Sequence, residues 1–196
     1  MGRLKVHDAS TADALLAVAE RLAETEGVGA ITVRRLADEI GTTTRAIYST
    51  FGTKDALIAA LGIRAFALLE HSVRRGALTD DPVRDLVYAG ATAFRNFARN
   101  HTGLYRIAFD PVATPPQIWS QVAPVNADAW DALVHRVARL GLDVPAEPLA
   151  MQFHAMCEGL AINELRGNLG PTRAAKSVWT QALTALVSGW TKVEVA

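Results

Sequence analysis

Apolar residues recur at helical spacing along almost the whole chain of 196 residues. They stand at every third or fourth position, which places them on one face of an α-helix. Glycine, proline and capping residues separate the segments and mark where one helix ends and the next begins. The pattern predicts an all-α fold of about nine helices, at residues 10–26, 33–40, 44–51, 54–75, 82–100, 102–110, 118–137, 147–166 and 172–191.

Three of these helices have boundaries or breaks that depend on particular residues. The sequence STAD at residues 10–13 resembles a capping box, so we expect the first helix to begin there. Asp81 followed by Pro82 is an N-cap with proline at the first helical position. Pro124 lies inside the segment 118–137, and we expect it to kink or split that helix because proline lacks the backbone N–H donor.

The stretch from Ile31 to Leu57 is organised as two short helices joined by a tight turn and followed by a third helix. Thr32 is placed to cap the first helix, and Gly41 supplies the positive φ that ends it. The second helix, 44–51, buries one apolar face and turns hydroxyl, arginine and tyrosine side chains outward. This arrangement is typical of a helix-turn-helix, whose second helix lies in the major groove of DNA.

Further residues of this stretch resemble the DNA-binding half of the TetR family of transcriptional regulators. They are the run LADEIG at residues 36–41, then Ala46, Ile47, Tyr48, Phe51, Lys54, Ala56 and Leu57. The resemblance covers roughly the first third of the chain, and beyond it length, helical content and layout agree. It implies a helix-turn-helix DNA-binding domain at 1–53 and a C-terminal helical ligand-binding and dimerisation domain at 54–196.

The function that the resemblance implies is that of a DNA-binding transcriptional regulator, not an enzyme. Such a protein is expected to be a homodimeric repressor that binds a palindromic operator and is released by a small-molecule inducer. Two-fold symmetry would place the two reading helices about 34 to 36 Å apart, or somewhat more, along the DNA. The alternative is a small all-helical enzyme or ligand carrier whose helix-turn-helix does not bind DNA.

Polar residues on the outer side of the helix-turn-helix are the candidate DNA contacts. They are Thr32, Thr42, Thr43, Thr44, Arg45, Tyr48, Ser49 and Lys54. Threonine hydroxyls and backbone N–H groups at helix N-termini hold phosphates, and arginine pairs with guanine. Tyr48 is expected to contact a phosphate or a thymine methyl group, and Lys54 a phosphate. The alternative role is plain capping for Thr43 and a solvated surface charge for Arg45.

The net charge is formally zero, with 20 basic and 20 acidic residues, so DNA binding has to rely on local positive charge. Arg34 and Arg35 each precede an acidic residue, Asp38 or Glu39, by four positions. Such i,i+4 pairs would partly neutralise both arginines on their own helix. We therefore expect few phosphate contacts per subunit.

The two last predicted helices carry more apolar surface than one chain can cover, which favours a two-fold helical interface. The resemblance implies the same, a dimer through the last two helices that forms a four-helix bundle. The residues expected to form the interface are Phe153, Leu160, Val178, Trp179, Ala182 and Leu186.

Aromatic and polar residues in the middle and late helices are candidates for binding a small apolar or aromatic ligand. They are Phe94, Tyr105, Trp119, Trp130, Met151, His154 and Glu158. The proline-containing segment from Trp119 to Trp130 is the best candidate for a pocket wall. For each of these residues the alternative is ordinary packing in the core, because an aromatic stripe at helical spacing is usually core.

His154, Cys157 and Glu158 share one helical face, but three residues on one helix complete neither a zinc site nor a catalytic triad. We therefore predict no catalytic residue, no metal and no cofactor. The single cysteine excludes an internal disulfide, which fits a reduced cytoplasm. No apolar run approaches the length of a membrane span, so we expect a cytoplasmic protein without a membrane partner.

Overall fold

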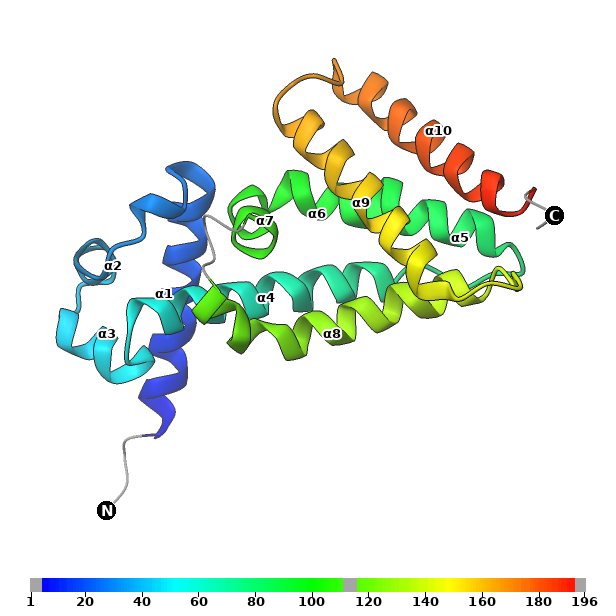
Figure 1. Ribbon diagram of the computed structural model, residues 1–196. Helices are drawn as coiled ribbons and strands as arrows, with labels where there is room; N and C mark the ends of the chain where they lie inside the picture. The colour runs from blue at the N-terminus through cyan, green and yellow to red at the C-terminus, as the bar shows by residue number, and fades with distance from the viewer. Residues whose placement is uncertain (1–4, 111–115, 193–196) are drawn as a thin grey trace. The chain divides into compact units, whose positions relative to one another are not determined.

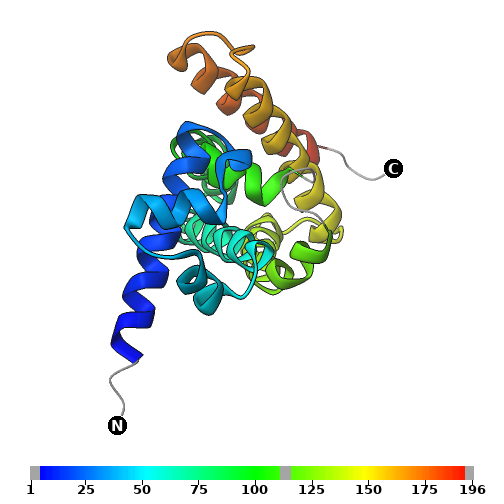
Figure 2. The ribbon, with the colours of Figure 1, turned by 90° about the vertical axis from the view of Figure 1, so that its left-hand side faces the viewer.

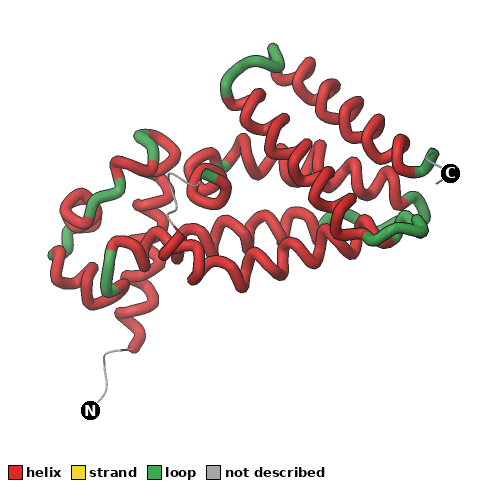
Figure 3. The backbone as a smooth tube through the Cα atoms, viewed as in Figure 1, coloured by secondary structure: helices red, strands yellow, loops and turns green. Residues whose placement is uncertain are grey.

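The computed structural model describes residues 5–110 and 116–192, which form helices joined by short loops (Figures 1 and 3). The helices are α1 (Lys5–Thr25), α2 (Val33–Ile40), α3 (Thr44–Phe51), α4 (Lys54–Arg74), α5 (Pro82–Tyr88), α6 (Arg95–Asn100), α7 (Thr102–Phe109), α8 (Pro116–Ala138), α9 (Ala146–Leu165) and α10 (Thr172–Trp190). A 3-10 turn, η1 (Val28–Ala30), precedes α2, and a π-helical segment, η2 (Ala89–Phe94), joins α5 to α6. With α5, η2 and α6 counted as one, the described residues hold nine helices, so the all-α prediction is confirmed.

The first helix begins earlier than the sequence pattern predicted. Helix α1 starts at Lys5, so residues 10–13 lie inside the helix instead of capping it. No glycine or proline stands between Lys5 and Thr25, and nothing in that stretch stops the helix. A capping signal alone does not set a boundary when the backbone on both sides is free to stay helical.

Two predicted helices contain irregularities of different kinds. Helix α8 runs through Pro124 without being split, and residues Ile118, Val122 and Val137 are buried on either side of the proline. This burial holds the two parts in one helix although proline removes a backbone hydrogen bond. The helix predicted at 82–100 is continuous, but its middle widens into the π-helical segment η2, which accommodates one extra residue.

The chain divides into two compact units. Unit 1 comprises Met1–Ala67 and His101–Asn126, and unit 2 comprises Leu68–Asn100 and Ala127–Ala196. Helices α4 and α8 each contribute residues to both units. This division does not coincide with the expected boundary after residue 53, because the first part of α4 and the whole of α7 belong to unit 1.

Helix α1 is central to unit 1, where it packs against α2, α3 and α7 (Figures 1 and 2). Its residues Leu15, Ala19 and Leu22 are fully buried. Helix α7 approaches α1 closely, since a Cβ atom added at Gly103 would lie 2.5 Å from the backbone carbonyl carbon of Ala23. The helix-turn-helix therefore packs on a helix, α1, that is itself fixed by contacts with α7.

In unit 2, the continuous helix α5–η2–α6 packs against α9 and α10. Gly90 allows this contact, because a Cβ atom there would lie 2.5 Å from Cδ1 of Leu183 and 2.8 Å from Cζ of Phe153. The buried Arg95 donates to both carboxylate oxygens of Glu164 at 2.8 and 2.6 Å. The indole of Trp179 donates to the same carboxylate at 2.8 Å, so one acid joins α6, α9 and α10.

Helix α4 corrects the expectation that no apolar run reaches the length of a membrane span. It has 21 residues and, by length and composition alone, is long and apolar enough to cross a membrane. In its most apolar stretch of 18 residues, 44 % is buried inside the protein. Leu57, Leu61 and Ala65 on this helix are fully buried in unit 1. The core helix of a globular protein has the same composition, which explains why α4 passes such a test.

Candidate nucleic-acid interface

The turn between α2 and α3 is closed by Gly41, which has φ 67° and ψ 36°. These values lie in the left-handed region, which glycine adopts without steric penalty. The N–H of Thr42 donates to the carbonyl of Ala37 at 2.9 Å, which is the hydrogen bond of a Schellman motif. The helix end and the sharp turn follow from this glycine, as the sequence predicted.

Three threonines cap the helices of this region. The hydroxyl oxygen of Thr32 accepts from the N–H of Arg35 at 3.2 Å, and that of Thr43 accepts from Ala46 at 3.2 Å. Thr53 caps α4 in the same way, through Ala56 at 3.0 Å. Each hydroxyl uses one lone pair for the cap, which leaves its O–H available as a donor.

Four charged side chains fasten α2 to α1 and to the turn between them. Arg35 donates to Glu39 at 2.9 Å and to Glu26 at 3.1 Å, and Arg21 of α1 donates to Glu39 at 2.6 Å. The hydrogen bond from Arg35 is the main cause that lowers the pKa of Glu39. This cluster neutralises Arg35, as its i,i+4 spacing predicted.

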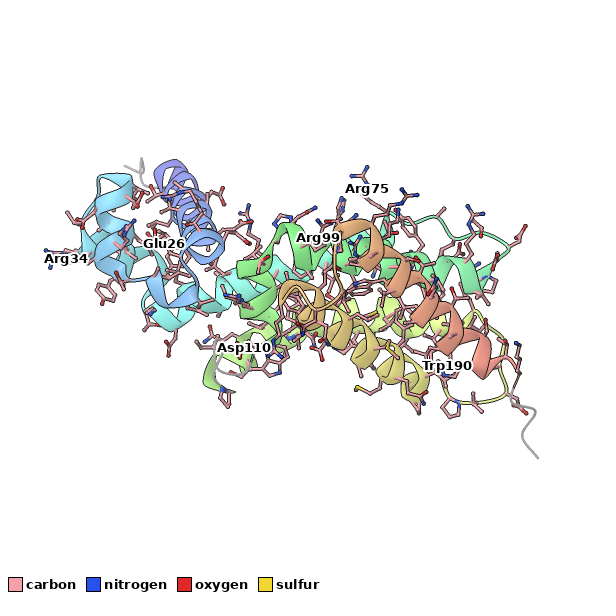
Figure 4. All side chains as sticks on the ribbon, turned by 90° about the horizontal axis from the view of Figure 1, so that it is seen from above. Glu26, Arg34, Arg75, Arg99, Asp110 and Trp190 are labelled. Atoms are coloured by element: carbon pink, nitrogen blue, oxygen red, sulfur yellow. The ribbon has the colours of Figure 1, made fainter. Side chains whose placement is uncertain are left out.

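Arg34 differs from its neighbour Arg35. It makes no ion pair with Asp38 or with any other part of the chain that the structure describes, and it projects outward (Figure 4). Spacing alone could not separate the two arginines, because each has an acid four residues later. The difference arises because Glu26 and Arg21 come from other segments and engage only one of the two pairs.

The outward face of α3 carries polar side chains over a buried apolar one. Thr44, Arg45 and Ser49 are exposed, Tyr48 is 52 % exposed, and Ile47 is buried beneath them. The Ser49 hydroxyl donates to the carbonyl of Ala46 at 2.8 Å, which turns its oxygen outward as an acceptor. Thr42 in the turn is half-buried, and Lys54 at the start of α4 is exposed. Unit 1 thus presents hydroxyl groups, a phenol and positive charges on an exposed surface.

Two family models match the chain over most of its length. Residues 15–61, which contain the helix-turn-helix, match the model described as bacterial regulatory proteins, tetR family. Residues 87–186 match the model of the tetracyclin repressor-like C-terminal domain. The chain belongs to the TetR family. It is therefore a DNA-binding transcriptional regulator and not an enzyme, which sets aside the alternative of a helical enzyme or carrier.

Solved structures resemble this TetR-family chain over nearly its whole length. A protein of unknown function from Rhodococcus sp. RHA1 is 26 % identical, with a TM-score of 0.79 over 97 % of this chain and 100 % of that one. PfmR, a TetR family transcriptional regulator from Thermus thermophilus, is 18 % identical, with a TM-score of 0.67 over 92 % and 98 % of the two chains. A TetR variant from Acinetobacter baumannii AYE in complex with minocycline is 18 % identical, with a TM-score of 0.67 over 99 % and 100 %. No curated protein matches the chain in sequence.

The candidate ligand-binding residues of this TetR-family chain fall into two groups. In unit 2, the ring of His154 meets the rings of Phe94 and Trp130 edge-on, with centroids 6.1 and 6.0 Å away. Glu158 lies one turn further along α9, with its carboxylate 3.7 Å from Nε2 of His154. Met151 is 55 % exposed on the same helix.

The other two candidates, Tyr105 and Trp119, lie in unit 1. There the ring of Phe109 lies 5.2 Å from that of Tyr105, and the ring of Phe66 lies 5.7 Å from that of Trp119. Phe66 and Phe109 are themselves 5.4 Å apart, which joins the four rings into one cluster. The sequence could not show which of the candidates lie in which unit.

Burial shifts the pKa of two residues on α9. It lowers the pKa of His154, and the neighbouring Glu158 offsets only part of this effect. Burial also raises the pKa of the Cys157 thiol, which is therefore a weak nucleophile. Within residues 5–110 and 116–192, no group of three or more His, Cys, Asp or Glu side chains could hold a metal ion.

The expected interface residues of α9 and α10 do not share one environment. Phe153, Leu160 and Trp179 are buried within the single chain, Ala182 and Leu186 are half-buried, and Val178 is exposed. The large apolar residues that are exposed on the described parts of the two helices are Met151, Met156, Ile162 and Val178.

Proposed function

We propose that this TetR-family regulator is a cytoplasmic homodimeric repressor. It binds a palindromic operator through two copies of α3 and is released when a small apolar or aromatic ligand binds to its C-terminal part. The observation that carries the proposal is the outward face of α3, where Arg45 and Tyr48 stand exposed above the buried Ile47. A helix held rigidly on its inner side and polar on its outer side fits the major groove.

In this proposal the DNA contacts divide into base readout and phosphate contacts. Arg45 and Thr44, near the start of α3, read base edges, since arginine forms two hydrogen bonds with guanine. Tyr48, Ser49 and Lys54 contact phosphates. Further phosphate contacts come from the hydroxyls and backbone N–H groups at Thr32, Thr42 and Thr43, which stand at or just before helix N-termini.

A DNA-selection experiment tests the proposal. The wild-type protein selects fragments from a random-sequence library, and binding to the selected palindrome is measured by fluorescence anisotropy across a salt series. The double substitution Tyr48→Ala with Lys54→Ala should abolish specific binding and leave the helical circular dichroism unchanged. Arg75→Gln, which removes an exposed charge in unit 2, is the control and should bind as the wild type does. If the double variant binds with unchanged affinity, α3 does not read the DNA.

Arg34 and Arg35 provide a second, matched comparison. Arg34 is available for a phosphate, whereas Arg35 is engaged by Glu26 and Glu39. Arg34→Gln should therefore weaken binding to all sequences and reduce the salt slope by about one for each phosphate that the arginine neutralises. Arg35→Gln should leave the salt slope unchanged. Equal slopes in the two variants would remove Arg34 from the proposed contacts.

The proposed dimer interface is the outer face of α9 and α10. It is supported by Gly159, which stands in the interior of α9 although glycine destabilises a helix by roughly 0.5–1 kcal/mol relative to alanine. A Cβ atom at Gly159 would have no neighbour within 4 Å in the chain, so packing within the described residues does not require this glycine. Close approach of a second copy would require it. Ile162 and Val178 are exposed on the same two helices, and Leu160 and Trp179 are buried beneath their surface.

The oligomeric state tests this interface. Gly159→Leu fills the space reserved for the second copy and should shift the dimer toward monomer in sedimentation velocity experiments. The matched control is Ala67→Leu, which adds a similar volume at an exposed position of α4. A Gly159→Leu protein that remains dimeric at the same concentrations as the wild type would exclude this face.

The ligand is proposed to bind next to the ring cluster of Phe94, Trp130 and His154 in unit 2. Support comes from the aromatic character of this cluster and from the minocycline bound in the structure of the Acinetobacter relative. A panel of planar aromatic compounds that includes minocycline should contain members that raise the melting temperature and release the selected DNA. A compound that acts on the wild type and fails on Trp130→Ala would place the ligand there, and one that acts equally on both would place it elsewhere.

A further inference from the structure

Two arginines near the end of α8, Arg136 and Arg139, reach across to the end of α4 and to the segment that follows it, all within unit 2. Arg136 donates through Nη2 to the carbonyl of Val73 and, at 2.9 Å, to that of Gly76. Arg139 donates to the carbonyl of Thr79 and, at 2.7 Å, to the carboxylate of Asp85. The first arginine therefore holds the end of α4, and the second holds the segment that leads into α5.

The contact made by Arg136 is a helix cap supplied by another helix. The last carbonyl groups of an α-helix have no partner within the helix, and together they carry a partial negative charge. The chain itself closes the end of α4 with hydrogen bonds from the N–H of Arg75 to His71 and from the N–H of Gly76 to Val73. Arg136 adds a positively charged donor from another helix to the carbonyls of Val73 and Gly76.

Burial of Arg136 carries a desolvation cost. The side chain is 4 % exposed, and its Nη1 is buried without a hydrogen-bond partner in the described parts of the chain. An unpaired buried donor carries a desolvation penalty, and an apolar side chain of similar volume is often equally or more stable at such a position. The favourable effect of Arg136 therefore lies in what it holds in place.

We propose that Arg136 is a positioning residue that couples α8 to the C-terminal end of α4 and thereby sets the operator affinity of the protein. This inference rests on the proposed repressor function. Helix α4 is continuous from Lys54, one of the proposed DNA contacts, to Arg74, next to the carbonyl that Arg136 binds. Helix α8 carries Trp130, which belongs to the proposed ligand cluster. A ligand that displaces α8 has to move α4 with it or break the two hydrogen bonds, which gives the two states of a switch.

The test compares three variants of the full-length protein. Arg136→Met removes the donors and keeps the apolar length of the side chain, Arg136→Lys keeps a charged donor, and Arg139→Met is the matched control one helical turn away. Hydrogen exchange of the amides at residues 71–76 reports whether the end of α4 is held. Fluorescence anisotropy with the palindrome selected by the wild-type protein reports operator affinity, and circular dichroism reports folding.

We expect Arg136→Met to stay folded, to exchange faster at residues 71–76 and to bind the palindrome about fivefold more weakly or worse, the usual size of a coupling between sites. Arg136→Lys should keep part of the exchange protection at residues 71–76 and part of the affinity for the palindrome. Arg139→Met should keep wild-type affinity. Unchanged exchange or affinity in Arg136→Met, or an equal loss in Arg139→Met, would overturn the proposal. If Arg136→Met does not fold, Arg136→Lys decides between the same outcomes. If the wild type selects no palindrome, the repressor function fails, and the exchange data still decide whether Arg136 holds α4.

Discussion

The helix-turn-helix in unit 1 and the packing of α9 and α10 in unit 2 are stabilised by interactions of different range along the chain. In the helix-turn-helix, Thr43 caps a helix through a residue three positions away, and Gly41 ends a helix through its own backbone conformation. In unit 2, Arg95 and Glu164 are 69 positions apart. The first kind of interaction is visible in a short stretch of sequence, and the second exists only in the folded chain.

This difference predicts how much free energy of unfolding is lost when each kind of interaction is removed. A cap or a turn contributes the free energy of one hydrogen bond or one backbone conformation, partly exposed to water. A buried ion pair contributes more, because removing the anionic partner leaves a buried charge without a counter-ion. Substitutions in unit 2 should therefore destabilise the protein more than substitutions in the helix-turn-helix.

The largest effect is expected for Glu164→Gln. This substitution leaves the buried Arg95 without its anionic partner and should lower the free energy of unfolding by about 3–5 kcal/mol. Urea denaturation followed by circular dichroism measures it. The control is Arg74→Gln, which removes the exposed pair of Arg74 with Glu70, a pair 2.6 Å apart, and should change stability by less than about 1 kcal/mol. Similar values for both substitutions would show that the buried pair stabilises the protein no more than an exposed pair does.

A smaller effect is expected for Gly90→Ala. The added methyl group would lie within 3.0 Å of Leu183, Phe153 and Cys157, all of which are buried, so the packing of α9 and α10 has to shift. Overpacking of this kind lowers stability by about 1–3 kcal/mol. Gly159→Ala is the control, because its methyl group meets no atom of residues 5–110 and 116–192 within 4 Å. Thermal unfolding at several protein concentrations separates folding from association, and a stable Gly90→Ala protein would show that this contact adapts.

Replacing Thr43, the N-cap residue of α3, by alanine should lower the free energy of unfolding by about 1 kcal/mol. The loss should be confined to the start of α3, because the hydroxyl oxygen accepts from the N–H of Ala46 in the first turn of that helix. Hydrogen exchange of the amides at residues 44–47 measures it. Thr44→Ala, at the next position, removes an exposed hydroxyl without removing the cap and should leave the exchange unchanged.

The smallest effect concerns the pH dependence of unit 2. Burial lowers the pKa of His154 in the folded chain below its ordinary value of 6.5. The unfolded chain then binds a proton more readily, so this contribution to stability is complete above pH 6.5 and is lost as the pH falls toward the folded-state pKa. The melting temperature of the wild type should drop more steeply below pH 6.5 than that of His154→Gln. If the melting temperatures of the two proteins fall in parallel with pH, His154 does not contribute to the pH dependence of stability.

The sequence predicted most of the fold and the inner frame of the candidate DNA interface. Helix positions followed from apolar spacing, and the cap at Thr32 and the turn at Gly41 followed from residue type. Only the structure showed which of the threonines at 42–44 caps α3, namely Thr43. The start of α1 was predicted too late, because capping residues also occur inside helices. The π-helical segment and the unbroken path of α8 through Pro124 could not be predicted, since both depend on what packs against these helices.

By itself, the sequence determined an all-helical chain with a helix-turn-helix and an exposed polar face on α3. These features depend on hydrogen bonds and backbone conformations that span only a few residues, so residue type and spacing are sufficient to specify them. Only the tertiary structure decided that Arg35 is neutralised while Arg34 is available, and that Arg95 and Arg136 are buried. Those properties depend on which distant segments come together, and the free energy of a charge depends on its surroundings more than on its position in the chain.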